Sequence, residues 1–168
     1  MNKDILFGGS SVFLIINEYK DYSSTLVRYG DKNSILEIEV YDFLGRIKTI
    51  DCAYVDDLTE SVINFPENNN LKLINQSMFI ESVKSTKYKP FKINFNRNEM
   101  DIIISKNTNI QSYYKNSRIE YYYDENEYLC YIRVKDLTLD EYKFLKKEQE
   151  IPGQYMFSVM PSDFEVDS

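Results

Sequence analysis

Alternation of apolar and polar residues with a period of two is the pattern that most constrains how this chain can fold. It is clearest over residues 36–41, where apolar side chains alternate with two glutamates and a tyrosine. Successive side chains of a strand point to opposite faces of a sheet, so this segment predicts a strand with one buried and one wet face. That pattern is typical of antiparallel sheets.

Three hairpins are predicted from pairs of such segments joined by turn residues. The pairs are residues 36–41 with 46–52, residues 91–95 with 100–105, and residues 117–123 with 128–134. Further strands are expected over residues 11–17 and 25–29, so the first half of the chain reads as a meander.

Helical signal is scarce and is clearest after Thr138. Thr138 and Glu141 have the spacing of a capping box, and an apolar stripe continues to Gln149 before Pro152 and Gly153. A shorter helix is predicted to begin at Thr59, and residues 71–84 are compatible with helix or strand. The predicted fold class is α+β: one mainly antiparallel sheet, or two small ones, built of hairpins and covered by one or two helices.

A single domain is expected over residues 1–160, followed by an acidic, frayed tail at residues 161–168. Within the domain, Ile38 to Thr59 resembles Ile119 to Thr138: each reads as a hairpin with a cysteine, at Cys52 or Cys130, that runs into a helix start. This echo predicts two duplicated halves, 11–84 and 90–160. Convergence is the alternative, because Asp and Thr are common helix caps.

The chain contains no histidine, which removes the commonest general base and transition-metal ligand. No Ser/His/Asp or Cys/His arrangement can form, and no phosphate-cradling glycine loop is present. Asp51, Asp56 and Asp57 are the best oxygen ligands for a divalent cation, but they lack EF-hand spacing. We therefore expect no enzyme activity, no cofactor and no metal, although paired carboxylates of the glycosidase type stay open.

The longest apolar run near the start, Val12 to Ile16, is too short for a transmembrane helix or the core of a signal peptide. Cys52 and Cys130 are therefore expected to be reduced core residues. These observations predict a cytoplasmic protein without a membrane partner.

Charge is segregated along the chain. The net charge of −7 combines two acidic flanks with a basic middle, residues 84–118, which carries eight basic and two acidic side chains. The blocks either neutralise each other within the fold or create a surface with a functional acidic face. Aromatic residues interleave with the lysines of the middle block, as stacking platforms for nucleic acid would: Tyr88, Phe91, Phe95, Tyr113 and Tyr114. A pI of 4.7 argues against a dedicated nucleic-acid binder.

The densest feature is residues 120–128, with four tyrosines and four carboxylates in nine residues. Cross-strand aromatic pairs that stabilise the sheet would explain it. An acidic, tyrosine-rich docking face for a basic partner would explain it too, because tyrosine is enriched at interfaces. The predicted contact residues are Glu120, Tyr122, Asp124, Glu125, Glu127 and Tyr128.

Three functions follow from these patterns. The first is an acidic inhibitor that neutralises a basic protein partner, such as an immunity protein against a nuclease-like toxin or a phage-encoded nucleic-acid mimic. The second is an assembly subunit that associates with itself through complementary charge blocks. The third is nucleic-acid binding through residues 84–118.

Overall fold

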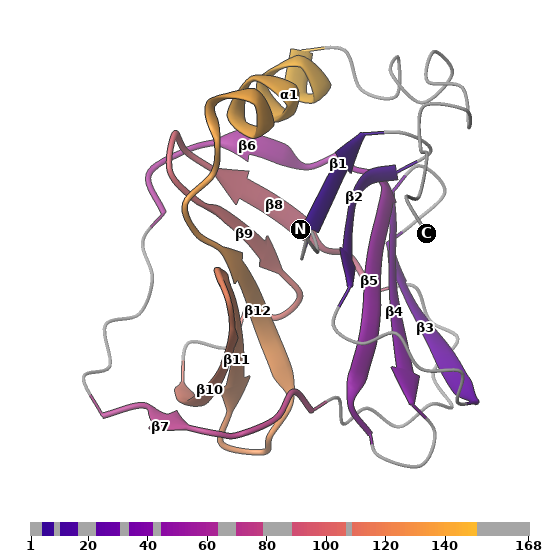
Figure 1. Ribbon diagram of the computed structural model, residues 1–168, viewed down its shortest axis with the longest axis vertical. Helices are drawn as coiled ribbons and strands as arrows, with labels where there is room; N and C mark the ends of the chain where they lie inside the picture. Colours follow the sequence, from indigo (N-terminus) through magenta and orange to yellow (C-terminus); the bar gives the residue numbers. More distant parts are fainter. Residues whose placement is uncertain are drawn as a thin grey trace.

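The computed structural model has two β-sheets and one helix, and its architecture is broadly α+β (Figure 1). The structure describes residues 5–8, 11–16, 23–30, 34–41, 45–63, 70–78, 89–106 and 109–150. The predicted acidic tail lies outside these residues, as do Tyr88, Pro152 and Gly153.

Sheet A contains five antiparallel strands in the order β1-β2-β5-β4-β3. They are β1 (Ile5–Gly8), β2 (Ser11–Ile16), β3 (Ser24–Gly30), β4 (Ile35–Tyr41) and β5 (Ile47–Tyr54). The predicted hairpin of β4 with β5 is confirmed. The simple meander is wrong, because β2 pairs with β5 rather than with β3. Strands β2 to β5 thus follow a Greek-key path.

Sheet B contains seven strands in the order β6-β8-β9-β12-β11-β10-β7. They are β6 (Leu58–Glu60), β7 (Lys72–Leu73), β8 (Lys92–Phe95), β9 (Met100–Ile103), β10 (Ile110–Asn116), β11 (Ile119–Asp124) and β12 (Leu129–Val134). The five inner strands are antiparallel, and both predicted hairpins, β8–β9 and β11–β12, are confirmed. The outer strands β6 and β7 pair in parallel, so sheet B is mixed.

Helix α1 (Leu139–Glu150) begins where the capping box predicts. Thr138 Oγ1 accepts a hydrogen bond from the Glu141 N–H, and the Glu141 carboxylate accepts one from the Thr138 N–H. The helix lies across one end of the two sheets (Figure 1). There Phe144 contacts Phe7 of sheet A, and the Tyr142 hydroxyl donates to Glu60 of sheet B.

The second predicted helix is wrong, because Thr59 lies in β6. A capping residue competes with other hydrogen-bond partners of the backbone. Here the backbone of residues 58–60 pairs with β8, so no helix begins at Thr59. The repeat of a hairpin followed by a helix is therefore not found, since a strand follows β5 and a helix follows β12. Of residues 71–84, the described part contains the short strand β7 and no helix.

The two sheets share one apolar core. Cross-strand registers place inward residues in matching rows, which are Ile5, Ile15, Ile50, Ile38 and Val27 in sheet A and Ile93, Ile102, Ile132, Tyr121 and Tyr114 in sheet B. Their common strand order, β1-β2-β5-β4-β3 and β8-β9-β12-β11-β10, makes the rows directly comparable. These rows match Ile50 of β5 with Ile132 of β12, so the residue equivalent to Cys52 is Val134 and not Cys130. The two cysteines of the sequence echo therefore do not occupy equivalent positions.

At the end of the sheets opposite α1, residues 70–78 connect sheet B to sheet A, and we name this segment the strap (Figure 1). The Ile74 N–H donates to the Tyr113 carbonyl, and the Met78 N–H donates to the buried Tyr123 hydroxyl. On the sheet A side, Arg46 donates to the Gln76 side chain at 2.6 and 3.0 Å. The strap thus fixes the lower ends of both sheets.

Candidate partner-binding site

The predicted acidic turn lies at the end of the β11–β12 hairpin, and Asp124 holds its shape. One Asp124 carboxylate oxygen accepts hydrogen bonds from the N–H groups of Asn126 at 2.9 Å and Tyr128 at 3.0 Å. The Asp124 carbonyl accepts another from the Glu127 N–H. Asp124 is itself buried, so its carboxylate stabilises the turn rather than facing solvent.

Three of the six predicted contact residues are exposed at this turn: Glu125, Glu127 and Tyr128. We call them the hairpin tip. Tyr128 keeps 47% of its surface accessible, which is unusual for a large aromatic residue. Glu127 has a φ of 64°, in the left-handed region that side chains other than glycine seldom adopt. The tip therefore presents two carboxylates and a phenol ring on a backbone fixed from below by Asp124.

Glu120 and Tyr122, two further predicted contact residues, are buried on the outer face of sheet B. The Tyr122 hydroxyl donates to the Glu120 carboxylate at 2.5 Å, and Lys135 approaches the same carboxylate at 3.1 Å. The Tyr122 ring stacks on Tyr113 with a centroid separation of 5.9 Å. The structure therefore divides the predicted site into the exposed hairpin tip and a buried part around Glu120 and Tyr122, which we call the buried base.

Arg133 is the centre of that base. Its guanidinium forms two parallel hydrogen bonds of 2.7 Å with the Asp101 carboxylate and lies over the Tyr122 ring. Across the strands the outer row reads Asp101, Arg133, Glu120, Lys115, so that opposite charges face each other at every step. Arg133 is only 7% exposed, and Asp101 and Glu120 are buried with it, so these three charges are shielded from solvent.

Burial dominates the electrostatics of this base. Loss of hydration raises the pKa of Asp101 above its usual value, and the Arg133 hydrogen bonds only partly oppose that effect. Burial and the hydrogen bond to Glu120 raise the pKa of Tyr122 far above its ordinary value. Tyr122 therefore stays a neutral hydrogen-bond donor and cannot serve as a general base near neutral pH.

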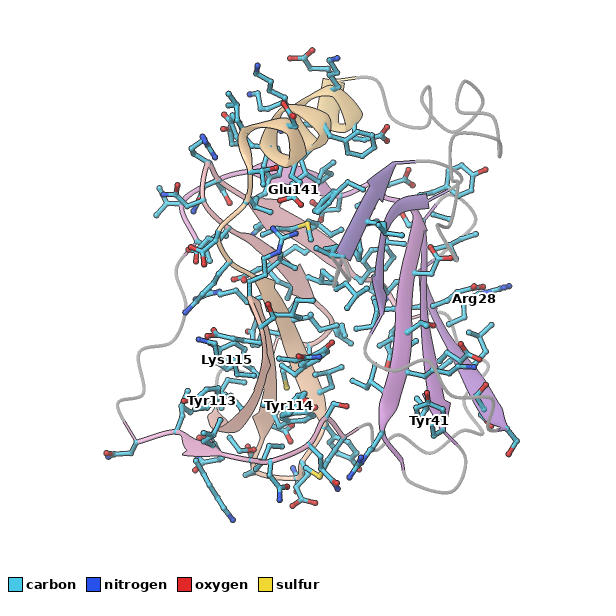
Figure 2. The ribbon with its side chains drawn as sticks, viewed as in Figure 1. Arg28, Tyr41, Tyr113, Tyr114, Lys115 and Glu141 are labelled. Carbon is cyan, nitrogen blue, oxygen red and sulfur yellow. The ribbon has the colours of Figure 1, made fainter. Side chains whose placement is uncertain are left out.

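The basic middle of the chain does not form the predicted aromatic platform in the described residues. Phe91 and Phe95 are buried in the shared core. Tyr113 and Tyr114 point to opposite sides of sheet B (Figure 2), and Tyr114 packs toward the core, where it stacks on Tyr121. Tyr113 is the member of this set that remains on the outer face.

Both cysteines are free thiols, and both are buried. Burial raises the pKa of Cys130 to about 11 and that of Cys52 well above its usual value. Neither is therefore set up as a thiolate nucleophile.

In the described part of the chain, no group of three or more Asp, Glu or Cys side chains is arranged to hold a metal ion, and Asp51, Asp56 and Asp57 form no such group. Likewise, α1 is neither long nor apolar enough to cross a membrane.

No protein-family model matches this sequence. A search of curated proteins finds no match either.

Sequence patterns missed Asp101 and Arg133, the residues that organise the buried base. A charged residue on an alternating strand normally indicates the wet face. The signal for these residues is that negative and positive side chains alternate across neighbouring strands. That alternation can be seen only once the register of β9, β12 and β11 is known.

Proposed function

We propose that this chain is a non-catalytic binding protein that engages a basic protein partner through the hairpin tip. The observation that supports this function is the exposure of Glu125, Glu127 and Tyr128 at the end of a hairpin whose strands are buried on both faces. Carboxylates steer the encounter with a basic partner, and an exposed tyrosine supplies rigid contact area.

Rigidity is what the buried base contributes to such a site. A partner that binds a fixed tip does not have to order the loop, so less of the contact energy is lost on association. Arg133 of β12 lies over the Tyr122 ring of β11, and Tyr122 donates to Glu120, so these residues tie the two strands together further along the hairpin from the tip. In this proposal the tip makes the contact and Glu120, Tyr122 and Asp124 support it.

The partner class we propose is a basic toxin or nucleic-acid-binding effector, with this chain acting as its inhibitor in the cytoplasm. The two free, buried cysteines support a reducing compartment, because such compartments keep thiols unpaired. An acidic tip could occupy a groove that normally receives phosphates, which is how a nucleic-acid mimic would act.

The first test is capture of a partner by tagged protein from its native host, at low and high salt. Changing Glu125 and Glu127 to lysine together with Tyr128→Ala is expected to abolish capture without lowering the denaturation midpoint in urea. The matched control reverses Asp56 and Asp140, which are exposed carboxylates outside the tip, and should leave capture intact. Capture that survives the tip variant would move the site elsewhere.

Assembly through complementary charge blocks is the second candidate. The ion pairs on sheet B weigh against it, because Asp101 is already paired with Arg133 and Glu120 with Lys135 within one molecule. Salt-sensitive association that depends on these buried residues would favour it over the inhibitor. Nucleic-acid binding is the third candidate, and it requires retention that weakens steeply as salt rises.

We further propose that the chain arose by duplication, from two copies of a five-stranded unit. Supporting observations are the common strand order of the two sheets and the correspondence of their inward rows. The equivalent units would be 5–54 and 92–134, rather than the halves suggested by the cysteines. Superposition of the two sheets is the test, and a mismatch of the paired rows would reject the idea.

A further inference from the structure

Helix α1 is far less buried than the strands that precede it. Of its twelve residues, Leu145 and Glu148 are buried, whereas all residues of β11 and β12 are buried. Segments that bury little surface open locally at a lower free energy than the whole protein unfolds. An isolated helix of this length is only marginally stable in water. The contacts that hold α1 on the sheets therefore decide how often it opens.

The apolar contacts of α1 reach both sheets at the end of the core (Figure 1). Phe144 packs beside Phe7 of β1, with the ring centroids 6.3 Å apart. Tyr142 packs beside Phe95 of β8, with the ring centroids 6.1 Å apart. Leu145 is fully buried in the shared core. Opening of α1 would expose these side chains to water, which keeps the open state a minor one.

The chain is anchored to sheet B immediately before α1 begins. The Leu137 N–H donates to the Asn98 carbonyl, and the Leu137 carbonyl accepts a hydrogen bond from Arg97. Leu137 is also buried in the shared core. Residues 138–140, which follow, are exposed. The chain is thus fixed up to Leu137, and α1 can pivot just beyond it without disturbing sheet B.

Arg118, in the turn between β10 and β11, makes a two-point contact with the first turn of α1. Its guanidinium forms two hydrogen bonds of 2.7 Å with the Glu141 carboxylate, and the two side chains are 18% and 15% exposed (Figure 2). Two-point pairs of this kind are stronger than single hydrogen bonds, and burial protects them from screening by salt. The same carboxylate accepts the Thr138 N–H of the capping box. We call the pair of Glu141 and Arg118 the latch.

We propose that α1 is a hinged lid that opens as a unit while both sheets stay folded, and that the latch controls its opening. A second polar contact lies further along the helix, where Tyr142 and Lys146 donate to the Glu60 carboxylate. The Lys146 and Glu60 side chains are 37% and 33% exposed, about twice as exposed as the pair of the latch. Exposed ion pairs contribute little to stability, because water and salt screen them. The latch is therefore the stronger of the two contacts.

Acid should release the latch. Burial by itself would raise the pKa of Glu141, but the hydrogen bonds from Arg118 and from the Thr138 N–H lower it below 4.5. Arg118 faces this carboxylate from the turn between β10 and β11, and Thr138 faces it from the start of α1. The latch therefore holds above pH 4.5 and is lost as the pH falls through the folded pKa of Glu141.

Native-state hydrogen exchange at pH 7, followed for each amide by NMR, tests the lid and its latch. In the unmodified protein the α1 amides should share one opening free energy, lower than that of the β11 and β12 amides. Arg118→Met should raise the opening of α1 about tenfold, because it removes two charged hydrogen bonds. Glu141→Gln suits the capping box but loses the charge, so its effect should be similar, and the double variant should add little to either.

The matched control is Glu60→Gln, which removes the more exposed pair of the same helix and should change the opening less than about threefold. As the pH falls below 4.5, opening of α1 should rise more in the unmodified protein than in Glu141→Gln. Exchange of the α1 amides only together with those of β11 and β12 would overturn the lid. Equal effects of Glu60→Gln and Arg118→Met, or additive effects of the two latch variants, would overturn the latch.

Discussion

Sheets A and B follow the same strand order but differ on their outer faces. In sheet B the outer row alternates in charge, and three of its residues are buried, with Arg133 between Asp101 and Glu120. The corresponding row of sheet A places Glu37 opposite Asp51, and both are only half-buried. Arg28 completes that row at the exposed edge.

This difference shows that two sheets with the same strand order can differ in how their outer faces are packed. The outer face of sheet B packs a second small cluster, in which Tyr122, Cys130 and Tyr131 lie against Ile110. Its central hairpin is therefore buried on both sides and can hold a fixed tip. Sheet A has one strongly buried face, and its outer charged residues Glu37 and Asp51 are only half-buried. The inner rows define the common fold, and the outer rows distinguish the two sheets.

Removing the cation of the buried row should have the largest effect on this comparison. Arg133→Met leaves the buried Asp101 carboxylate without the guanidinium that binds it at two points, whereas Glu120 keeps Lys135 and Tyr122. An uncompensated buried charge costs about 3–5 kcal/mol of unfolding free energy. Urea denaturation followed by circular dichroism measures the loss.

Arg28→Met in sheet A is the matched control for this change. Its ion pair with Glu37 is largely exposed, so the loss should stay below about 1 kcal/mol. Equal losses for Arg28→Met and Arg133→Met would show that the two outer faces do not differ energetically.

Acid titration should separate the two sheets next. Hydrogen bonds from Ser24, Lys48 and Thr49 lower the pKa of Glu39 on sheet A below 4.5, whereas burial raises that of Asp101 on sheet B above 3.8. Glu39 therefore stabilises the fold above pH 4.5, and this contribution is lost as the pH falls through its folded pKa. Asp101 has the opposite effect on stability. Because burial raises its pKa in the folded state, its ionisation is less favourable there than in the unfolded chain, and the protein loses stability as the pH rises above 3.8.

Carboxyl titrations by NMR and urea denaturation between pH 3 and 7 check these signs. Glu39→Gln should cost about 1 kcal/mol at pH 7, because it removes a charged hydrogen-bond acceptor, and it should flatten the loss below pH 4.5. A Glu39 carboxyl that titrates above 4.5, or an Asp101 carboxyl that titrates below 3.8, would contradict these signs.

The smallest effect is expected at two residues with positive φ, at the end of β3 and just after β10. Gly30 in sheet A and Ser117 in sheet B occupy equivalent positions, and both have positive φ values, of 117° and 56°. Glycine adopts such a conformation without strain, so Ser117→Gly should raise stability by about 0.5–1 kcal/mol. Ser117→Ala keeps the strain and serves as the control in thermal denaturation. A gain with alanine equal to that with glycine would argue against backbone strain.

Sequence patterns predicted the local units of this fold better than their arrangement. Period-two alternation located the strands of three hairpins, and the Thr138 capping box located α1. The position of β2 beside β5 depends on contacts between distant segments, which periodicity does not encode. Thr59 shows the same limit, since pairing with β8 overrides its local preference.

The candidate site was predicted in part, for the same physical reason. Sequence placed Tyr121 and Tyr123 on one face and Glu120 and Tyr122 on the other, as the structure does. Whether the second face is exposed depends on what neighbouring strands supply, and Arg133 comes from a strand that sequence alone did not place beside Asp101.

The strap also has a mechanical consequence. It joins sheet A to sheet B at one end through Arg46, Gln76 and Tyr123, while α1 bridges the sheets at the other end. A force that slides one sheet past the other must therefore break hydrogen bonds at the strap and separate the Phe7 and Phe144 rings at α1. The load is shared between two distant contacts, so the pair of sheets should resist shear better than either contact would alone.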